Sequence, residues 1–200
     1  AQAVLDELEL IVQRIAIDPP KAVVIHSRKP GAFAAGADIK EFQGFDASGS
    51  VEDVLRRGQR IYPKLAGLRM PTVAAIHRPR LCGGTQLALA CRYRVATDHP
   101  KTVFALPEVQ LGVIPGLGGT QRLPKLVGLQ AALDMILAGR NVRAKRALQM
   151  GLVDEMVHPA ILREIALDRA RALAEQKLVP RRGFLPGALS LVLEHNPLGR

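Results

Sequence analysis

The sequence contains no tryptophan, and aromatic side chains make up only 4% of its 200 residues. Platforms that stack nucleic-acid bases need such rings, so the composition argues against sequence-specific binding of nucleic acid. There are two cysteines, Cys82 and Cys91, and they do not form a Cys-x-x-Cys pair. This pattern supports neither a disulfide framework nor a zinc knuckle, and it favours a reducing compartment.

Long hydrophobic runs are also missing. No uninterrupted apolar stretch reaches the roughly 18 residues that a membrane span requires, and the opening AQAVLDELEL is amphipathic and acidic, unlike a signal peptide. We therefore expect a cytoplasmic protein without a membrane span. Because the chain opens in a helical pattern and without methionine, we interpret it as part of a longer protein. The histidines lack metal-ligand spacing, so we expect no metal and interpret all of them as structural: His26, His77, His99, His158 and His195.

The sequence does contain the material for a packed core and a basic surface. Apolar residues make up 48% of the chain, and a length of 200 residues suits one domain. The formal net charge of +10 predicts a surface that attracts anions such as phosphates, nucleic acid or acidic lipid. The charge therefore bears on partners and not on the fold.

Hydrophobic spacing divides the chain into short strands and amphipathic helices. Apolar runs bounded by proline, glycine or charged residues predict buried parallel strands in KAVVIHS, PTVAAI, YRVAT and TVFAL. A 3/4 spacing of apolar residues predicts helices at the start of the chain, over 54–68 and in QLALAC, and this spacing dominates after Gln121. The recurring unit of strand, glycine turn and helix predicts an α/β spiral of short parallel strands, with residues 121–200 mostly helical.

Two turns of small residues are candidates for an oxyanion hole. In IHRPRLCGGTQLALAC a strand ends, Gly83 and Gly84 make a turn, and a helix begins, so backbone N–H groups there can point at one oxygen. AFAAGADIKEF forms a second turn, with Asp38 as a candidate helix N-cap. Two separate turns can supply the convergent donors that an enolate-like oxygen needs. The plain alternative is that Gly83–Gly84 is only a tight strand-to-helix connection.

A carboxylate lies beside a third, glycine-containing loop. In LPEVQLGVIPGLGGTQRL, Glu108 follows a proline at a strand end, and Gly116 belongs to the flexible stretch behind it. Such a carboxylate is a candidate general acid or base, and the alternative is a solvated side chain. Cys82 is a candidate nucleophile by its place in the turn, but a lone cysteine without an activating partner is more typical of inert packing.

Taken in this order, four segments resemble signatures of the enoyl-CoA hydratase/isomerase (crotonase) superfamily: AFAAGADIKEF, LALAC, LPEVQLGVIPGLGGTQRLP and LAGRNVRAKRALQMGLVDEMV. The resemblance covers about residues 20–160. Within the superfamily the chain is most similar to the hydratase domain of multifunctional fatty-acid oxidation complex α-subunits. The resemblance implies a single crotonase-like domain over 1–200, which lacks its first strands and the dehydrogenase domain that follows in those proteins.

The resemblance also implies roles for individual residues. The amides of Ala37 and Gly83 match the two oxyanion-hole donors, and Glu108 matches the downstream catalytic glutamate. Lys40 matches a position that faces the CoA phosphates, the alternative being a solvated helix face. Further substrate-binding positions are implied at Ala35, Asp38, Ile39, Gly84, Pro115 and Gly116. No cofactor is implied, because CoA is part of the substrate.

The chain departs from the family pattern in one of these turns. Gln86 stands where the family has its upstream catalytic glutamate, and an amide cannot take or give a proton at neutral pH. Losing one general acid or base typically costs about 10² to 10⁴ in rate, although Gln86 can still orient water. Arg78 and Cys82 replace family glycines, which would strain the turn if those positions have positive φ.

These observations leave three functions open. The leading one is hydration of 2-trans-enoyl-CoA in fatty-acid β-oxidation, impaired by Gln86. The second is Δ3,Δ2-enoyl-CoA isomerisation, for which Glu108 alone suffices. The third is binding without turnover, by an acyl-CoA-binding pseudoenzyme or an RNA-binding homologue. Besides the acyl-CoA substrate, the resemblance implies a homotrimer or hexamer, or a thiolase subunit as partner in an oxidation complex.

Overall fold

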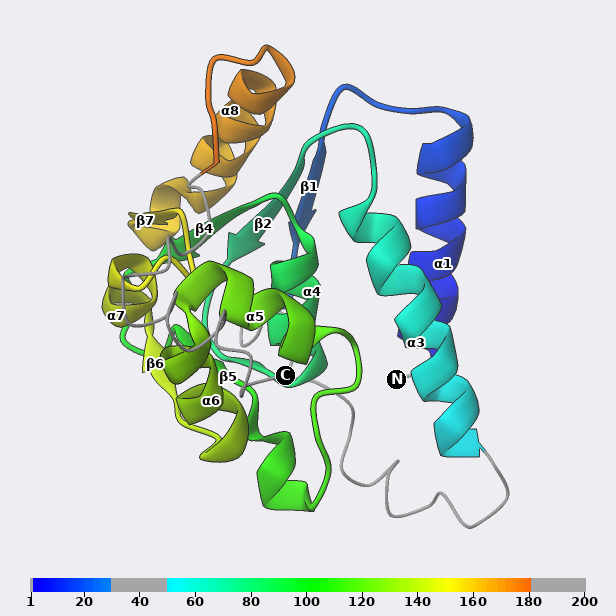
Figure 1. The fold of residues 1–200 in the computed structure, drawn as a ribbon. Helices are drawn as coiled ribbons and strands as arrows, with labels where there is room; N and C mark the ends of the chain where they lie inside the picture. Colours follow the sequence, from blue (N-terminus) through cyan, green and yellow to red (C-terminus); the bar gives the residue numbers. More distant parts are fainter. Residues whose placement is uncertain (1, 30–49, 181–200) are drawn as a thin grey trace, which may run out of the picture.

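A four-stranded parallel sheet lies at the centre of the computed structural model, which describes residues 2–29 and 50–180 (Figure 1). The strand order is β1-β2-β4-β7, and each strand runs parallel to its neighbour. The strands are β1 (Val23–His26), β2 (Thr72–Ile76), β4 (Tyr93–Thr97) and β7 (Glu155–Val157). Every residue of β2 and β4 is buried, as expected for central parallel strands covered on both faces. The predicted α/β class is therefore confirmed.

A second sheet has the strand order β3-β5-β6. Its strands are β3 (Arg80–Leu81), β5 (Val103–Ala105) and β6 (Val142–Arg143). The pair β3 and β5 is parallel, whereas β5 and β6 are antiparallel, so the expectation of parallel strands alone was wrong here. Hydrophobic spacing also missed β3, β6 and β7, because strands of two or three residues are too short to display a period.

Helices surround the two sheets and dominate the described chain after Gln121, as predicted. Over the described residues the α-helices are α1 (Gln2–Ile17), α3 (Ser50–Ala66), α4 (Gly83–Ala90), α5 (Gly119–Val127), α6 (Leu129–Leu137), α7 (Ala144–Gln149) and α8 (Leu162–Ala174). Two 3-10 helices, η1 (Pro107–Leu111) and η2 (Pro159–Ile161), follow β5 and β7. Within the described ranges no helix has both the length and the apolar character needed to cross a membrane.

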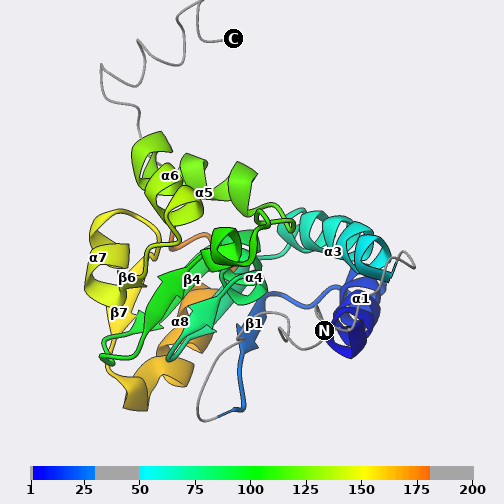
Figure 2. The ribbon, with the colours of Figure 1, turned by 90° about the horizontal axis from the view of Figure 1, so that it is seen from below.

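The alternation of side chains along β2 assigns the two faces of the main sheet to different helices. Val73 and Ala75 pack against Ala166 and other apolar residues of α8. Ala74 and Ile76 point the other way, into a core shared with α4, α5 and α6. Figure 2 shows α4 and α8 on opposite sides of the sheet. The sheet is thus a layer between helices, and α4 joins it to the candidate site.

The helices α1 and α3 form a pair beside the sheet, visible in both ribbon views (Figures 1 and 2). Their shared core contains Leu5 and Val12 of α1 and Ile61, Tyr62 and Leu65 of α3. The 3/4 spacing of these residues explains why each helix buries one face. Through Tyr62, this pair also reaches the turn at the start of α4.

Candidate active site

The turn that starts α4 is fixed by hydrogen bonds to β5 and within α4. The Cys82 amide donates to the Ala105 carbonyl at 3.2 Å, and the Gln86 amide donates to the Cys82 carbonyl at 3.1 Å. The hydroxyl of Thr85, a fully buried residue, donates to the same Ala105 carbonyl at 2.9 Å. Gly83 is the first residue of the helix, so its N–H lies outside the helical ladder. The turn therefore presents a backbone donor from a rigid element.

Both glycine replacements noted in the sequence occur at positive φ. Arg78 has φ 64°, and Cys82 has φ 51° with ψ −121°. A residue with a Cβ is strained in such a conformation, at a cost of about 1–3 kcal/mol. The turn nevertheless forms, because the Arg78 amide donates to the Thr102 hydroxyl at 3.1 Å and the contacts to Ala105 hold Cys82.

Cys82 has the wrong electrostatics for a nucleophile. Burial, and to a lesser degree the nearby Glu108 carboxylate, raise the pKa of the Cys82 thiol to about 11. The reactive thiolate is therefore scarce near neutral pH. Cys91 directly follows α4 and is buried in the core shared with α5 and α6, and burial raises its pKa to about 12. Neither cysteine has the depressed pKa that nucleophilic catalysis requires.

Gln86 and Glu108 meet inside the protein. The Gln86 Nε2 donates to the Glu108 Oε1 at 3.0 Å, and the two residues are only 2% and 6% exposed. The opposite end of the amide is also engaged, because Gln86 Oε1 accepts hydrogen bonds from the amides of Leu117 at 2.8 Å and Gly119 at 2.9 Å. These three contacts define the orientation of the side-chain amide, with its NH₂ group on the carboxylate. Gln86 thus links α4, η1 and the 116–119 loop.

Glu108 has the properties of a proton-transferring carboxylate. Its Oε2 is buried and makes no hydrogen bond with the described residues, whereas Oε1 is held by Gln86. Burial raises the pKa of Glu108 above its ordinary value, an effect partly offset by a backbone hydrogen bond and by the Gln86 amide. A raised pKa brings a carboxylate closer to the range where it can take a proton and return it at neutral pH.

The loop between η1 and α5 packs against α3. Gln59 donates from Nε2 to the Gly116 carbonyl at 3.1 Å, and a Cβ at position 116 would lie only 2.9 Å from Leu55 Cδ2. Gly116 therefore permits a close approach that larger residues would hinder. Pro115 precedes it and is buried. Leu117 completes the loop, and its Cδ1 would lie 3.5 Å from a Cβ placed on Gly83.

The structure brings together several of the predicted site residues. Gly83, Gln86 and Glu108 belong to one cluster, with Gly116 on the adjoining loop. Gly84 is buried within the first turn of α4. The other predicted positions lie outside the described residues: Ala35, Ala37, Asp38, Ile39 and Lys40.

Sequence reasoning missed Tyr62 and Leu117, which lie against the Gly83 turn. The Tyr62 hydroxyl donates to the Gly83 carbonyl at 3.2 Å, and Leu117 contacts Gly58 of α3 as well as the neighbourhood of Gly83. A glycine inside a helix costs about 1 kcal/mol, so an interior glycine often marks a close approach. Gly58 was therefore the available signal for Leu117, whereas nothing in the spacing distinguished Tyr62 from core.

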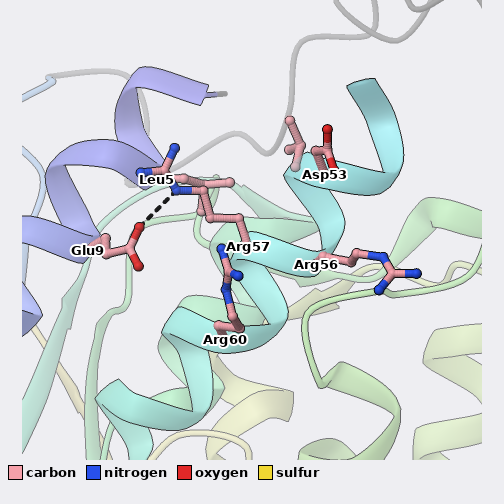
Figure 3. A pocket seen from close by; sticks show the side chains of 7 residues that line it. Leu5, Glu9, Asp53, Arg56, Arg57 and Arg60 are labelled. Carbon is pink, nitrogen blue, oxygen red and sulfur yellow. Dashed lines mark hydrogen bonds and ion pairs between the residues drawn. The ribbon is translucent and has the colours of Figure 1, made fainter. Parts of the chain in front are cut away.

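Two cavities lie away from this cluster. One, of about 310 Å³, lies between α1 and α3 and is lined by Arg56, Arg57 and Arg60 (Figure 3). Two of these arginines are paired, because Arg57 contacts both Asp6 and Glu9 and Arg56 contacts Glu52. The other, of about 260 Å³, lies at the carboxyl ends of β1 and β2. No group of three or more potential metal ligands occurs among residues 2–29 and 50–180.

The similar known sequences belong to proteins much longer than this chain. The fatty acid oxidation complex subunit alpha of Vibrio campbellii is 43% identical over 190 residues, which are 93% of this chain and 27% of that protein. The corresponding subunit of Idiomarina loihiensis is 44% identical over 196 residues, or 98% of this chain and again 27% of the relative. This chain thus spans about a quarter of the length of these relatives.

Comparison with solved structures gives two kinds of enzyme. The enoyl-CoA hydratase of Bacillus anthracis is 35% identical with a TM-score of 0.80, covering 87% of this chain and 67% of that one. The human mitochondrial delta3-delta2-enoyl-CoA isomerase is 28% identical with a TM-score of 0.79, covering 90% and 69%. The enoyl-CoA hydratase/isomerase family matches residues 1–181. A match over so much of the chain shows that the protein belongs to the enoyl-CoA hydratase/isomerase family and is an enzyme of the crotonase superfamily.

Proposed function

We propose that this enzyme isomerises 3-enoyl-CoA thioesters to 2-enoyl-CoA thioesters, with Glu108 as the one group that moves the proton. The observation that carries the proposal is the Gln86–Glu108 hydrogen bond of 3.0 Å. It pairs the candidate base with an amide, where a second carboxylate would be needed for two-group acid–base chemistry. A 1,3-proton shift needs only one carboxylate, which removes a proton and returns it two carbons away.

The reaction would begin with the thioester oxygen bound by the amide of Gly83 and, as the family resemblance implies, that of Ala37. This binding stabilises the negative charge that develops on the oxygen. Glu108 Oε2 then takes a proton from C2, and the electrons of the C2–H bond pass into a dienolate. Return of the same proton to C4 moves the double bond from C3–C4 to C2–C3. No cofactor is consumed, because the substrate is neither oxidised nor reduced.

Gln86 acts in this proposal as a positioning residue. Its carbonyl oxygen is occupied by the amides of Leu117 and Gly119, so its NH₂ group faces Glu108. That contact occupies Glu108 Oε1 and leaves Oε2 as the oxygen that reacts. The same contact favours the ionised carboxylate, which a general base must be before it takes a proton.

Hydration of 2-enoyl-CoA is the second candidate. It is favoured by the 35% identity to the Bacillus anthracis enoyl-CoA hydratase and by the fatty acid oxidation names of the longer relatives. With one carboxylate, Glu108 would have to deprotonate water and later deliver a proton to C2. Replacing one member of an acid–base pair lowers such a rate by about 10² to 10⁴. The hydratase would therefore be slow.

Product analysis with two substrates separates these candidates. A short 3-enoyl-CoA and a short 2-enoyl-CoA are each incubated with the protein, and the products are resolved by chromatography. We expect conversion of the 3-enoyl-CoA to outpace hydration of the 2-enoyl-CoA, and we expect the Glu108→Gln variant to lose it. The exposed Glu52→Gln variant is the matched control. Faster hydration would favour the hydratase, and binding without conversion of either substrate would identify a pseudoenzyme.

Assembly is part of the proposal, since the relatives belong to fatty acid oxidation complexes. We propose that the protein acts as a homotrimer or hexamer, or beside a thiolase subunit. Light scattering of the purified chain, alone and with a thiolase, tests this point. A chain that stays monomeric and does not bind thiolase would contradict the proposed assembly.

A further inference from the structure

The hydroxyl of Tyr62 reaches the candidate oxyanion turn from a different layer of the structure. Tyr62 belongs to α3, and its hydroxyl donates to the Gly83 carbonyl at 3.2 Å. The residue is 5% exposed and sits in the core between α1 and α3. Among the contacts described above, it is the side chain that ties α3 to the start of α4.

The hydrogen bond from Tyr62 restrains the backbone around Gly83. Neighbouring atoms of the turn are already held, because the Cys82 amide donates to Ala105 and the Cys82 carbonyl accepts from Gln86. Tyr62 adds a third point on the Gly83 carbonyl, which belongs to the next peptide group and restrains Gly83 on the side opposite its N–H. With φ of 51° at Cys82, the turn holds a conformation that its sequence does not favour. A side-chain tether from a packed helix opposes relaxation of that turn.

The burial of Tyr62 agrees with a hydroxyl that donates. Burial raises the pKa of Tyr62 well above its ordinary value, so the phenol keeps its proton. The nearby cation Arg122 offsets part of this rise in pKa, and its Nη1 donates to the Leu117 carbonyl at 2.9 Å. The Leu117 amide in turn donates to Gln86. Tyr62 and Arg122 therefore support the two halves of the site, the oxyanion turn and the loop that holds Gln86.

We propose that Tyr62 is a positioning residue for the oxyanion hole: its hydrogen bond to the Gly83 carbonyl restrains the peptide group after Gly83, and this restraint helps to keep the Gly83 N–H directed toward the thioester oxygen. This inference rests on the proposed function, because it requires a thioester oxygen at Gly83. It adds a residue that does not touch the substrate. A misdirected donor weakens binding of the developing charge more than binding of the ground state, so kcat suffers more than KM.

Infrared difference spectroscopy of a bound 2-enoyl-CoA, labelled with ¹³C at the thioester carbonyl, tests the proposal. In the full chain, the carbonyl band should move to lower frequency on binding. Tyr62→Phe should lose roughly half of that displacement, and kcat should fall about tenfold while KM changes less than about twofold, as expected for one lost neutral hydrogen bond. Tyr62→Met is a second variant for the case that phenylalanine packs poorly, because the flexible methionine side chain can fill the space of the ring. It should show the same loss of band displacement and of kcat as Tyr62→Phe.

Tyr93→Phe is the matched control. Tyr93 is 6% exposed, and its hydroxyl donates to Glu155 Oε2 at 3.3 Å, so this variant also deletes one buried phenol oxygen. It should keep the band position and kcat of the parent. Folded Tyr62 variants with the parent's band and kcat would overturn the positioning role alone. A parent that binds the thioester without displacing the band would overturn the proposed function together with this inference.

Discussion

Two buried polar pairs in this protein differ in how completely their charges are compensated. Arg94 on β4 and Asp154 beside β7 form an ion pair at 2.9 Å, and Arg94 also donates to the carbonyls of Leu152 at 2.9 Å and Cys91 at 2.7 Å. Glu108 instead faces the neutral amide of Gln86, and among the described residues it pairs with no cation. A compensated pair holds a fold together, whereas an uncompensated carboxylate is available for chemistry.

The comparison predicts the largest effect for loss of the uncompensated carboxylate. Glu108→Gln should lower the isomerase rate by about 10² to 10⁴, because it removes the one proton carrier of the site. The urea midpoint at neutral pH should not fall, and it should rise if anything, since no ion pair is lost and a buried carboxyl whose pKa is raised on folding is removed. Rates and unfolding curves measured on the same preparation check this. An active Glu108→Gln variant would place the chemistry elsewhere.

Loss of the compensated pair should have the opposite signature. Asp154→Asn leaves the Arg94 guanidinium buried without its counter-ion, and the free energy of unfolding should fall by about 3–5 kcal/mol. The rate per folded molecule should change little, because neither residue belongs to the candidate site. Urea unfolding with an activity assay measures both quantities. A variant with full stability but lost activity would reverse the assignment of the two pairs.

Gln86→Glu converts the uncompensated site into a pair of carboxylates. Two carboxylates about 3 Å apart cannot both ionise easily, so one should keep a proton and act as a general acid. Hydration of a short 2-enoyl-CoA should rise by about 10², because a second proton-transfer group is restored. Stopped assays of hydrated product test this, with acyl-CoA affinity as a control. Normal binding without faster hydration would show that the turn, and not the missing carboxylate, limits the reaction.

The pH dependence should report the environment of Glu108. Because burial raises its pKa, the acid limb of kcat/KM should lie above the ordinary carboxyl range, with activity lost as the pH falls through it. Gln86→Leu removes a contact that lowers this pKa, so the limb should move to higher pH. Gln130→Leu, at an exposed position on α6, should leave it in place. An unmoved limb in Gln86→Leu would contradict the role given to the amide.

The pH dependence of stability has the same origin. A carboxyl whose pKa is raised on folding favours the protonated folded state, so the fold should lose stability as the pH rises through that folded pKa. Glu108→Gln should remove this loss. Unfolding curves of both proteins at acidic and neutral pH give the comparison.

The smallest expected effect concerns the backbone of the turn. Cys82→Gly should relieve the positive φ of 51°. The free energy of unfolding should rise by about 1 kcal/mol, offset in part by the greater freedom of glycine in the unfolded chain. Thermal unfolding at fixed pH measures it. A clear loss of stability would mean that the cysteine side chain contributes packing that outweighs the strain.

The fold was predictable where hydrophobic runs are long and was not where strands are very short. The continuous apolar runs around Val73 and Val95 predicted central strands, because a strand that is buried on both faces does not alternate apolar with polar residues. Strand β7 was missed, since it has only three residues and each of them is half-buried. It is held in place by its parallel pairing with β4 and by the ion pair between Arg94 and Asp154, the residue before the strand. Such a strand is defined by its partner and not by its own sequence.

The candidate site was predictable only in part from the sequence. Glycines and the position of Glu108 indicated an oxyanion turn and a base. The sequence raised backbone strain at Arg78 and Cys82 only on the condition of a positive φ, and the structure meets that condition. The orientation of the Gln86 amide could not be predicted, because it depends on amides of a loop some thirty residues away. The hydrogen bond from Tyr62 to Gly83 could not be predicted either, because it joins residues far apart in the sequence and Tyr62 has the spacing of a core residue.

The most direct test of a single proton carrier follows a labelled proton. A 3-enoyl-CoA with deuterium at C2 is converted in ordinary water, and mass spectrometry with NMR locates deuterium in the product. Because Glu108 is 6% exposed, the account predicts that part of the deuterium taken from C2 appears at C4. Glu108→Gln should show neither turnover nor transfer. Rapid turnover that always takes the C4 proton from water, and that survives Glu108→Gln, would contradict the account.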